Sequence, residues 1–212
     1  MSINIKTLLI DDHKIVREGL KRILDESDDI NVIAEASNGY EAIRLINKND
    51  YDMIILDISM PGKSGLELLS DIIRLDPDQK VLILSMHAEN IYAKRTFLEG
   101  ACGYMTKESA SDDLIDAIHI INGGRKFISP ALVEILVDSI GLDKDISPHE
   151  QLSNREYQVF EKLAIGKKVF EIALELNLSS KTISTYRSRI MDKMRSSSNT
   201  ELTQYAIANN LI

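Results

Sequence analysis

Four short apolar runs of this chain each end at a polar residue whose side chain can take part in chemistry. Residues 8–10 run into Asp11 and Asp12, residues 53–56 into Asp57, residues 81–84 into Ser85, and residues 103–106 into Lys107. Short, continuous apolar runs are typical of strands buried on both faces, as in a parallel sheet covered by helices. Because ligands bind at the carboxyl ends of the strands in such sheets, we expect these side chains to share one edge of the sheet.

This edge would hold three carboxylates, a hydroxyl and an ammonium group. Neighbouring carboxylates repel one another, and a hard divalent cation such as Mg²⁺ bound between them would remove the repulsion. A carboxylate can also attack a phosphoryl group and form an acyl phosphate, so we predict that Asp57 is a phosphoacceptor. A cation held by Asp57 and by Asp11 or Asp12 would neutralise charge on the phosphoryl oxygens. Lys107 would add a positive charge and Ser85 a hydrogen bond.

Taken singly, each of these residues has an ordinary structural explanation. An aspartate that follows a strand, such as Asp12, often caps the next helix. A lysine at a strand end is usually a solvated surface charge, and a lone serine carries no signal. The order and spacing of the whole set, and not any one residue, indicate the phosphoryl-transfer site.

The elements that must position these residues alternate along the first 122 positions. The pattern predicts strands over 5–10, 30–34, 52–56, 80–84 and 103–105, and helices over 13–25, 38–48, 64–75, 89–99 and 111–121. Five repeats of strand then helix imply right-handed crossovers, with helices on both faces of one parallel sheet. Residues 1–122 are therefore predicted to form a five-stranded, doubly wound α/β domain.

The chain changes character after residue 122. Ser129 and Pro130 have the residue types of an N-cap and a first helical position, so they predict a short helix over about 130–140. The acidic residues that follow contain Pro148, and 123–150 is predicted to be a linker. Residues 151–212 are predicted to be all-helical. Their first helix follows a capping box of Ser153 and Glu156, and the others cover about 168–176, 180–194 and 200–209.

The helices over 168–176 and 180–194 have the spacing of a helix-turn-helix, whose second helix enters the major groove of DNA. Periodicity gives this second helix an inner apolar face, formed by Ile183, Tyr186, Ile190 and Met194. The predicted DNA contacts lie on its remaining surface: Lys181, Thr182, Ser184, Thr185, Arg187, Ser188, Arg189 and Lys193. Basic side chains suit phosphate contacts, and small hydroxyls can pair with either type of base edge.

Charge is unevenly distributed along the chain. The net charge is −8 at pH 7, made up of −7 over residues 1–128, −4 over 129–150 and +3 over 151–212. The whole-chain charge argues against nucleic acid as a partner, but the C-terminal third permits it. The single cysteine, Cys102, excludes an intrachain disulfide and fits a reducing compartment. Without a signal-peptide pattern or a membrane-length apolar run, we expect a cytoplasmic protein that does not contact membranes.

Together these motifs resemble a known family. The order and spacing of six residues resemble the receiver domain of two-component signalling: Asp11, Asp12, Asp57, Ser85, Tyr104 and Lys107. The segments 152–156, 171–173 and 178–183, with Gly166 and Lys193-Met194, resemble the LuxR-type helix-turn-helix. The chain is therefore similar to the NarL/FixJ-family response regulators over nearly its whole length, and among these to the GacA/UvrY and BvgA type.

The resemblance implies a flavodoxin-like receiver followed by a four-helix DNA-binding domain. It adds the backbone carbonyl of Ser59 as a metal ligand, and a phosphohistidine on a sensor histidine kinase as the phosphoryl donor. It also implies that Tyr104 turns inward when the phosphoryl group draws Ser85 toward it. Phosphorylation would promote a homodimer that binds promoter DNA. The apolar residues of the last segment could form a dimer face or pack inside one domain: Leu202, Tyr205, Ala206 and Leu211.

Two other functions could use the same residues. A haloacid-dehalogenase-type phosphatase also has a nucleophilic aspartate and a metal, but it needs a second aspartate where this chain has Ser59. A regulator of the same fold could work without phosphate, through constitutive dimers or a binding partner. The intact acid cluster and Lys107 argue against that alternative. We therefore expect a regulator, not an enzyme, that catalyses only its own phosphorylation and dephosphorylation.

Overall fold

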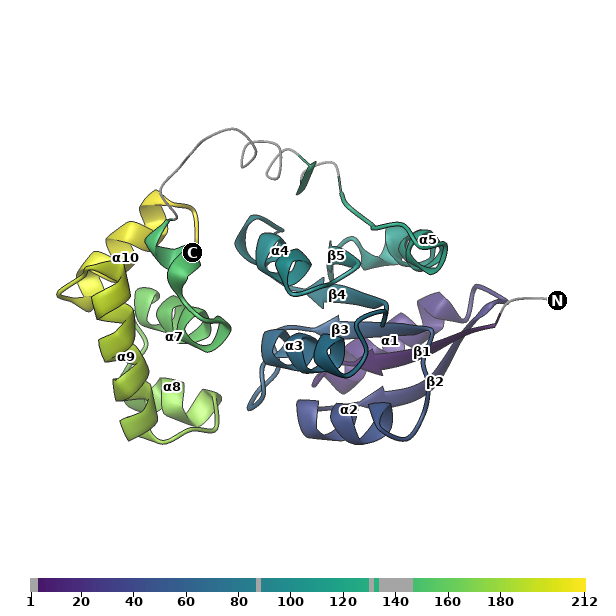
Figure 1. Ribbon diagram of the computed structural model, residues 1–212, viewed down its shortest axis with the longest axis horizontal. Coiled ribbons are helices and arrows are strands. Elements are labelled where there is room, and N and C mark those ends of the chain that lie inside the picture. The colour runs from purple at the N-terminus through teal and green to yellow at the C-terminus, as the bar shows by residue number, and fades with distance from the viewer. Residues whose placement is uncertain (1–3, 87–88, 130–131, 134–146) are drawn as a thin grey trace. The chain divides into compact units, whose positions relative to one another are not determined.

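The computed structural model describes residues 4–86, 89–129, 132–133 and 147–212 (Figure 1). The chain divides into two compact units, Met1–Ile140 and Gly141–Ile212. In the described part of the chain, no helix combines the length and the apolar character that crossing a membrane requires.

The first unit is built on a parallel sheet of five strands in the order β2-β1-β3-β4-β5. The strands are β1 (Ile5–Ile10), β2 (Ile30–Ala36), β3 (Met53–Asp57), β4 (Val81–Ser85) and β5 (Gly103–Thr106). Every residue of β3 and β4 is buried, as expected for strands that are covered on both faces. The predicted doubly wound α/β fold is confirmed, and strand ends differ from the predicted ones by two residues at most.

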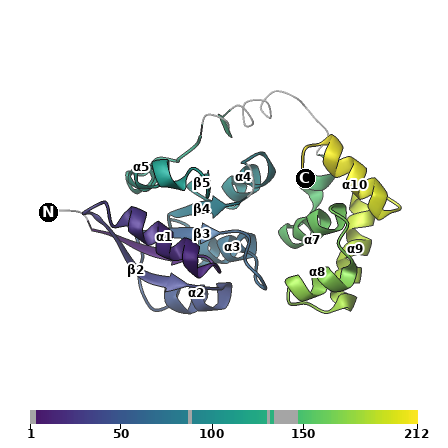
Figure 2. The same cartoon turned by 180° about the vertical axis from the view of Figure 1, so that it is seen from behind.

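Five helices cover the two faces of this sheet. They are α1 (Lys14–Leu24), α2 (Gly39–Ile46), α3 (Gly65–Leu75), α4 (Glu89–Leu98) and α5 (Ala110–Asn122). Helices α1 and α5 share one face, where Leu24 and Ile118 belong to the same buried cluster as Leu9 and Ile55 of the sheet. The opposite views of Figures 1 and 2 show α2, α3 and α4 on the other face. The buried apolar layers on both sides fix the strands, and therefore fix the positions of their carboxyl ends.

The second unit is helical. It contains a short 3-10 helix, η1 (Pro148–Gln151), and the helices α7 (Asn154–Ala164), α8 (Val169–Glu175), α9 (Ser180–Met194) and α10 (Asn199–Ala208). Ser153 and Glu156 form the predicted capping box at the start of α7. The 3-10 helix was not predicted, because residues 148–150 were assigned to the linker. Most of the helix predicted over 130–140 lies outside the described residues, although Leu132 and Val133 are helical.

The apolar face of α10 packs inside the second unit. Leu202 and Ala206 are fully buried, and α10 packs against α7. Tyr205 is half-buried, and its hydroxyl lies 2.8 Å from Nδ1 of His149 in η1. Of the two alternatives for these residues, packing within one domain is therefore the one that the structure supports.

Candidate functional site

The three aspartates of the predicted site lie together at one edge of the sheet. Asp57 ends β3 and Asp11 directly follows the neighbouring strand β1, and both residues are 1% exposed. Asp12 is partly exposed beside them. Carboxylate oxygens of all three, together with a ring nitrogen of His13, lie within 4.8 Å of one another. The strand order thus brings the three aspartates together, as predicted from their positions at the ends of the apolar runs.

Lys107 is buried between two of these carboxylates. Its Nζ lies 2.6 Å from Oδ2 of Asp11 and 2.8 Å from Oδ2 of Asp57, and the side chain is 8% exposed. Its backbone N–H donates to the carbonyl of Ser85, which holds it beside the end of β4. The solvated-surface explanation of Lys107 is therefore wrong. Burial alone would lower the pKa of this ammonium, but hydrogen bonds to Asp11 and Asp57 outweigh burial and raise it, so Lys107 stays charged.

The Asp57 carboxylate is held at both oxygens. Oδ1 accepts a hydrogen bond of 2.9 Å from the backbone N–H of Ser59, and Oδ2 accepts the one from Lys107. Burial raises the pKa of this carboxyl, and the Lys107 ammonium opposes the rise only in part. A buried carboxylate that its protein partners compensate incompletely is well suited to receive a further cation.

The donors of the cluster fit a divalent cation. Oδ1 of Asp12 is a buried oxygen that accepts no hydrogen bond from the described residues. Asp11 Oδ2 lies 2.6 Å from the Lys107 ammonium, and Asp12 Oδ1 lies 3.0 Å from Nδ1 of the His13 ring. Asp12 does not cap α1, because His13 occupies the N-cap position. Asp12 thus lacks the structural role that would explain it, and its oxygen is the type of ligand that Mg²⁺ prefers.

Gly65 is a site residue that the sequence analysis missed. A Cβ atom at this position would lie 2.2 Å from the backbone oxygen of Asp57 and 2.4 Å from Cα of Ile58. The first turn of α3, capped by Ser64, therefore lies directly against the backbone of the phosphoacceptor. In the sequence, the sign of this close packing is a glycine directly after the N-cap serine. Most residue types are tolerated at the first position of a helix, so a glycine there suggests a steric reason.

Ser85 and Tyr104 are both fully buried. Ser85 ends β4, and Tyr104 lies on the neighbouring strand β5 opposite Ile83. The resemblance implied that Tyr104 turns inward after phosphorylation, whereas the structure already has this side chain in a buried position.

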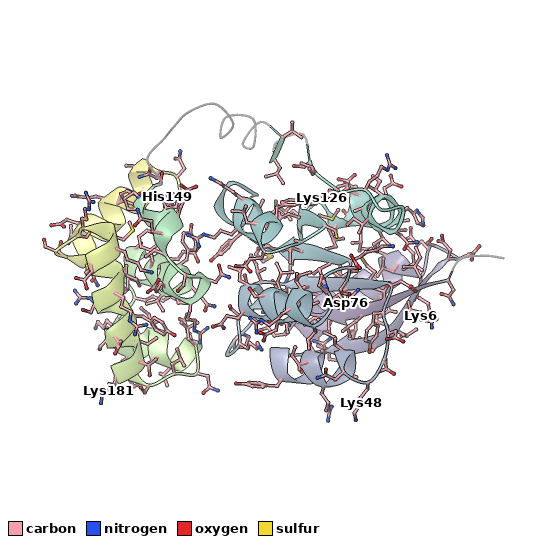
Figure 3. All side chains as sticks on the ribbon, in the orientation of Figure 1. Lys6, Lys48, Asp76, Lys126, His149 and Lys181 are labelled. Carbon is pink, nitrogen blue, oxygen red and sulfur yellow. The ribbon has the colours of Figure 1, made fainter. Side chains whose placement is uncertain are left out.

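In the second unit, α8 and α9 form the predicted helix-turn-helix. Asn177, in the left-handed region at φ 53°, makes the turn between them. On α9, Ile183, Ile190 and Met194 are buried, while the predicted contacts Lys181, Ser184, Thr185 and Ser188 are exposed. Figure 3 shows Lys181 at the beginning of α9, with its side chain directed away from the helices. Three of the four residues of the predicted inner face are therefore buried, and the fourth, Tyr186, is half-buried.

The basic residues of α9 have different surroundings. Arg189 is exposed, and makes no hydrogen bond or ion pair with another described residue. Arg187 donates from Nε to Asn199 at 2.9 Å. Lys193 lies 2.6 Å from Oε2 of Glu156, a buried residue of α7, and also donates to the carbonyl of Gln151. Lys193 therefore already has a role inside the unit, a role that helical periodicity alone could not reveal.

The Glu156–Lys193 pair predicts an acid-dependent stability of the second unit. Burial raises the pKa of Glu156, but the hydrogen bonds from Lys193 and Ser153 outweigh it, and the net shift is downward. Because the pKa is lower in the folded state, the stabilisation is present at neutral pH and is lost as the pH falls through the folded-state pKa, below about 4.5. We expect Glu156→Gln to lower the free energy of unfolding by about 1–2 kcal/mol at pH 7 and by less at pH 4.

Urea denaturation of the full chain, followed by NMR signals of residues 147–212, measures this difference at the two pH values. Glu171→Gln is a suitable control, because within the described part of the chain Glu171 accepts only from the backbone N–H of Lys168, at the start of α8. An equal loss of stability at pH 7 and pH 4 would contradict the ionic role of Glu156.

Comparisons with known proteins agree with both units. Residues 7–119 match the model of the response regulator receiver domain, and residues 150–206 match that of the luxR family of bacterial regulatory proteins. The chain is 37% identical over 208 residues to the response regulator UvrY of Escherichia coli K12, covering 98% of this chain and 95% of UvrY. It is 34% identical over 209 residues to the response regulator GacA of Pseudomonas aeruginosa, covering 98% of each chain. The predicted likeness to the GacA/UvrY type is confirmed.

Among solved structures, the chain is similar to RcsB. One such structure is RcsB of Salmonella enterica serovar Typhimurium bound to the promoter rprA in the presence of the phosphomimetic BeF3⁻. It superposes on this chain with a TM-score of 0.68 and 27% sequence identity, and the match covers 97% of this chain and 100% of that chain. A structure of two RcsB dimers bound to two parallel DNAs has a TM-score of 0.61 and 28% identity, with 97% and 98% covered.

Proposed function

Because the chain belongs to the response regulators that join a receiver domain to a LuxR-type DNA-binding domain, we propose that phosphorylation of Asp57 controls its binding to DNA. It is a two-component response regulator. We assign the receiver domain to residues 1–122, a linker to 123–150 and the DNA-binding domain to 151–212. The observation that carries the proposal is the buried Lys107 ammonium between Asp11 and Asp57.

In the proposed reaction, a carboxylate oxygen of Asp57 attacks the phosphorus of a phosphohistidine on a sensor histidine kinase. The P–N bond breaks, and an acyl phosphate forms on Asp57. Lys107, which remains charged, lies within 3 Å of Asp57 Oδ2 and can pair with a phosphoryl oxygen. The N–H of Ser59 orients the carboxylate. The chain would thus catalyse only its own phosphorylation and dephosphorylation.

Asp11, Asp12, Asp57 and the backbone carbonyl of Ser59 would hold the divalent cation. When bound, Mg²⁺ supplies the positive charge that neutralises the transferring phosphoryl oxygens. The buried Oδ1 of Asp12 supports this assignment, since it accepts no hydrogen bond from the described residues.

Ser85 and Tyr104 are the proposed switch residues. The Ser85 hydroxyl would donate to a phosphoryl oxygen, and Tyr104 would occupy its buried position more persistently once Ser85 is engaged. This is a population shift between two arrangements of the same fold. The phosphorylated chain would form a homodimer whose two α9 helices bind two half-sites of promoter DNA in the cytoplasm.

The phosphoacceptor is tested by incubating the full chain with Mg²⁺ and acetyl phosphate and measuring its intact mass. The proposal predicts the addition of one phosphoryl group to the wild type and none to Asp57→Ala, with fragmentation placing the group on Asp57. A phosphoryl group on another residue, or an equal yield in the variant, would contradict the assignment.

The DNA contacts predict a difference between two basic residues of α9. Arg189→Ala should weaken binding to all DNA sequences and reduce the slope of log K against log salt by about one, as the loss of one phosphate contact does. Lys193→Met should leave this slope unchanged, because its Nζ pairs with Glu156. Fluorescence anisotropy with a labelled promoter fragment at several salt concentrations measures both slopes. Equal reductions in the two variants would show that Lys193 also contacts phosphate.

A further inference from the structure

The side chain of Arg17 connects helix α1 to the loop after β1 that carries Asp11 and Asp12. Its NH1 donates a hydrogen bond of 2.7 Å to the backbone carbonyl of Asp11. Its Nε donates to Oε2 of Glu35, near the end of β2, at 3.1 Å. The side chain is only 13% exposed. Arg17 therefore links three elements, the end of β1, the end of β2 and helix α1, at the edge of the sheet where the carboxylates gather.

The backbone around Asp12 is held on both sides by Arg17. The guanidinium binds the carbonyl of Asp11 before it, and the Arg17 backbone N–H donates to the carbonyl of His13 after it, at 3.1 Å. His13, the N-cap of α1, makes no side-chain capping bond, and its backbone N–H donates to Oδ1 of Asp11 at 2.7 Å. The Arg17 guanidinium adds a bond from the side of the helix to the Asp11 carbonyl.

The guanidinium is itself oriented by an ionised partner. Glu35 accepts from Lys21 at 2.7 Å through its other carboxylate oxygen, Oε1. The hydrogen bond from Lys21, assisted by that from Arg17, lowers the pKa of Glu35 despite partial burial. Glu35 thus remains a carboxylate, and its Oε2 fixes the plane of the guanidinium toward the Asp11 carbonyl. Lysine lacks this planar fork and could satisfy only one of the two acceptors well.

We propose that Arg17 is a positioning residue for divalent-cation binding, which fixes the Asp11–Asp12 loop with its carboxylates turned toward Asp57. Arg17 touches no reacting atom and acts through the loop alone. The inference rests on the proposed cation site and adds to it a residue outside the acid cluster.

A positioning role and simple electrostatics predict opposite changes in the Mg²⁺ affinity when Arg17 is replaced. Arg17→Met removes a positive charge near a cation site, and by charge alone this variant should bind Mg²⁺ more tightly. If Arg17 positions the loop, the variant should bind Mg²⁺ about tenfold more weakly, which is the size expected from the loss of one charged hydrogen bond. Lys14→Met is the matched control, since Lys14 lies on the same helix, is 79% exposed and, of the residues that the structure describes, pairs only with the exposed Glu18. It should change the affinity by less than about twofold.

The experiment is a calorimetric titration of the full chain with MgCl2, for the wild type, Arg17→Met, Arg17→Lys, Glu35→Gln and Lys14→Met. Arg17→Lys and Glu35→Gln should each weaken binding by a smaller factor than Arg17→Met, and they keep the inference testable if Arg17→Met fails to fold. Phosphorylation by acetyl phosphate should be slower in Arg17→Met at low Mg²⁺ and return to the wild-type rate at saturating Mg²⁺. A disrupted fold would not recover in this way.

An unchanged or tighter Mg²⁺ affinity in folded Arg17→Met would overturn the inference while leaving the phosphoacceptor assignment intact. If the wild type itself bound no Mg²⁺, the cation site and the inference would both be wrong. These two failures are separated by the wild-type titration, which is performed first.

Discussion

Replacing Lys107 with methionine is expected to slow the phosphorylation of Asp57 by two to three orders of magnitude. Removing one preorganised positive group from a transition state typically costs about 10²–10³ in rate. Lys107 is such a group, since its ammonium is buried and bound to both Asp11 and Asp57. The measurement is the initial rate of phosphoryl incorporation from acetyl phosphate at saturating Mg²⁺.

The Mg²⁺ affinity of Lys107→Met should not fall, because the variant leaves two carboxylates without their competing cation. This distinguishes Lys107 from Arg17, whose loss is expected to weaken Mg²⁺ binding. Lys48→Met is the control for the loss of a lysine from the same unit, because Lys48 is exposed on the surface beyond α2 (Figure 3). A rate within a factor of about three of the wild type would exclude Lys107 from the phosphoryl-transfer step.

The second large effect is expected at Gly65. A Cβ at this position would meet backbone atoms of Asp57 and Ile58 at 2.2 and 2.4 Å, and backbone cannot yield as a flexible side chain does. We expect Gly65→Ala to lower the free energy of unfolding by about 1–3 kcal/mol, as overpacking of a well-filled interior does. Because the displaced atoms belong to the phosphoacceptor and its neighbour, the folded fraction should also be phosphorylated at least about tenfold more slowly.

Gly19→Ala is the matched control for this substitution. Gly19 lies in α1, and an added Cβ there would meet nothing within 4 Å. Alanine is the better helix former, so this variant should be more stable than the wild type by about 0.5–1 kcal/mol and phosphorylated normally. Urea denaturation and initial phosphorylation rates of the two variants provide the comparison. Wild-type behaviour of Gly65→Ala would mean that α3 can move away from Asp57 at no cost.

Much of the receiver unit could be predicted from the sequence because its signals are local. A buried parallel strand is a short apolar run, and the residue that ends it must lie at the carboxyl edge of the sheet. The sequence alone therefore predicts that Asp11, Asp57, Ser85 and Lys107 lie near one another. The helix start marked by the capping box of Ser153 and Glu156 could be predicted in the same way.

The features that the sequence did not predict are contacts between residues that are distant in the sequence. Arg17 was placed on a helix, but its bonds to Asp11 and Glu35 depend on how the helix packs beside the sheet. Lys193 looked like a free basic residue until α7 supplied Glu156, 37 positions earlier. The buried state of Tyr104 is likewise a tertiary property, since an aromatic residue on an edge strand could point either way.

The central claim is that a phosphoryl group on Asp57 controls DNA binding. The most direct test incubates wild type and Asp57→Ala with Mg²⁺, with and without acetyl phosphate, and measures oligomeric mass and affinity for promoter fragments. We predict that phosphate raises both the dimer fraction and the DNA affinity of the wild type, and that it changes neither in Asp57→Ala. Binding that is the same in all four samples would contradict the claim, and would assign the chain to the regulators that act without phosphate.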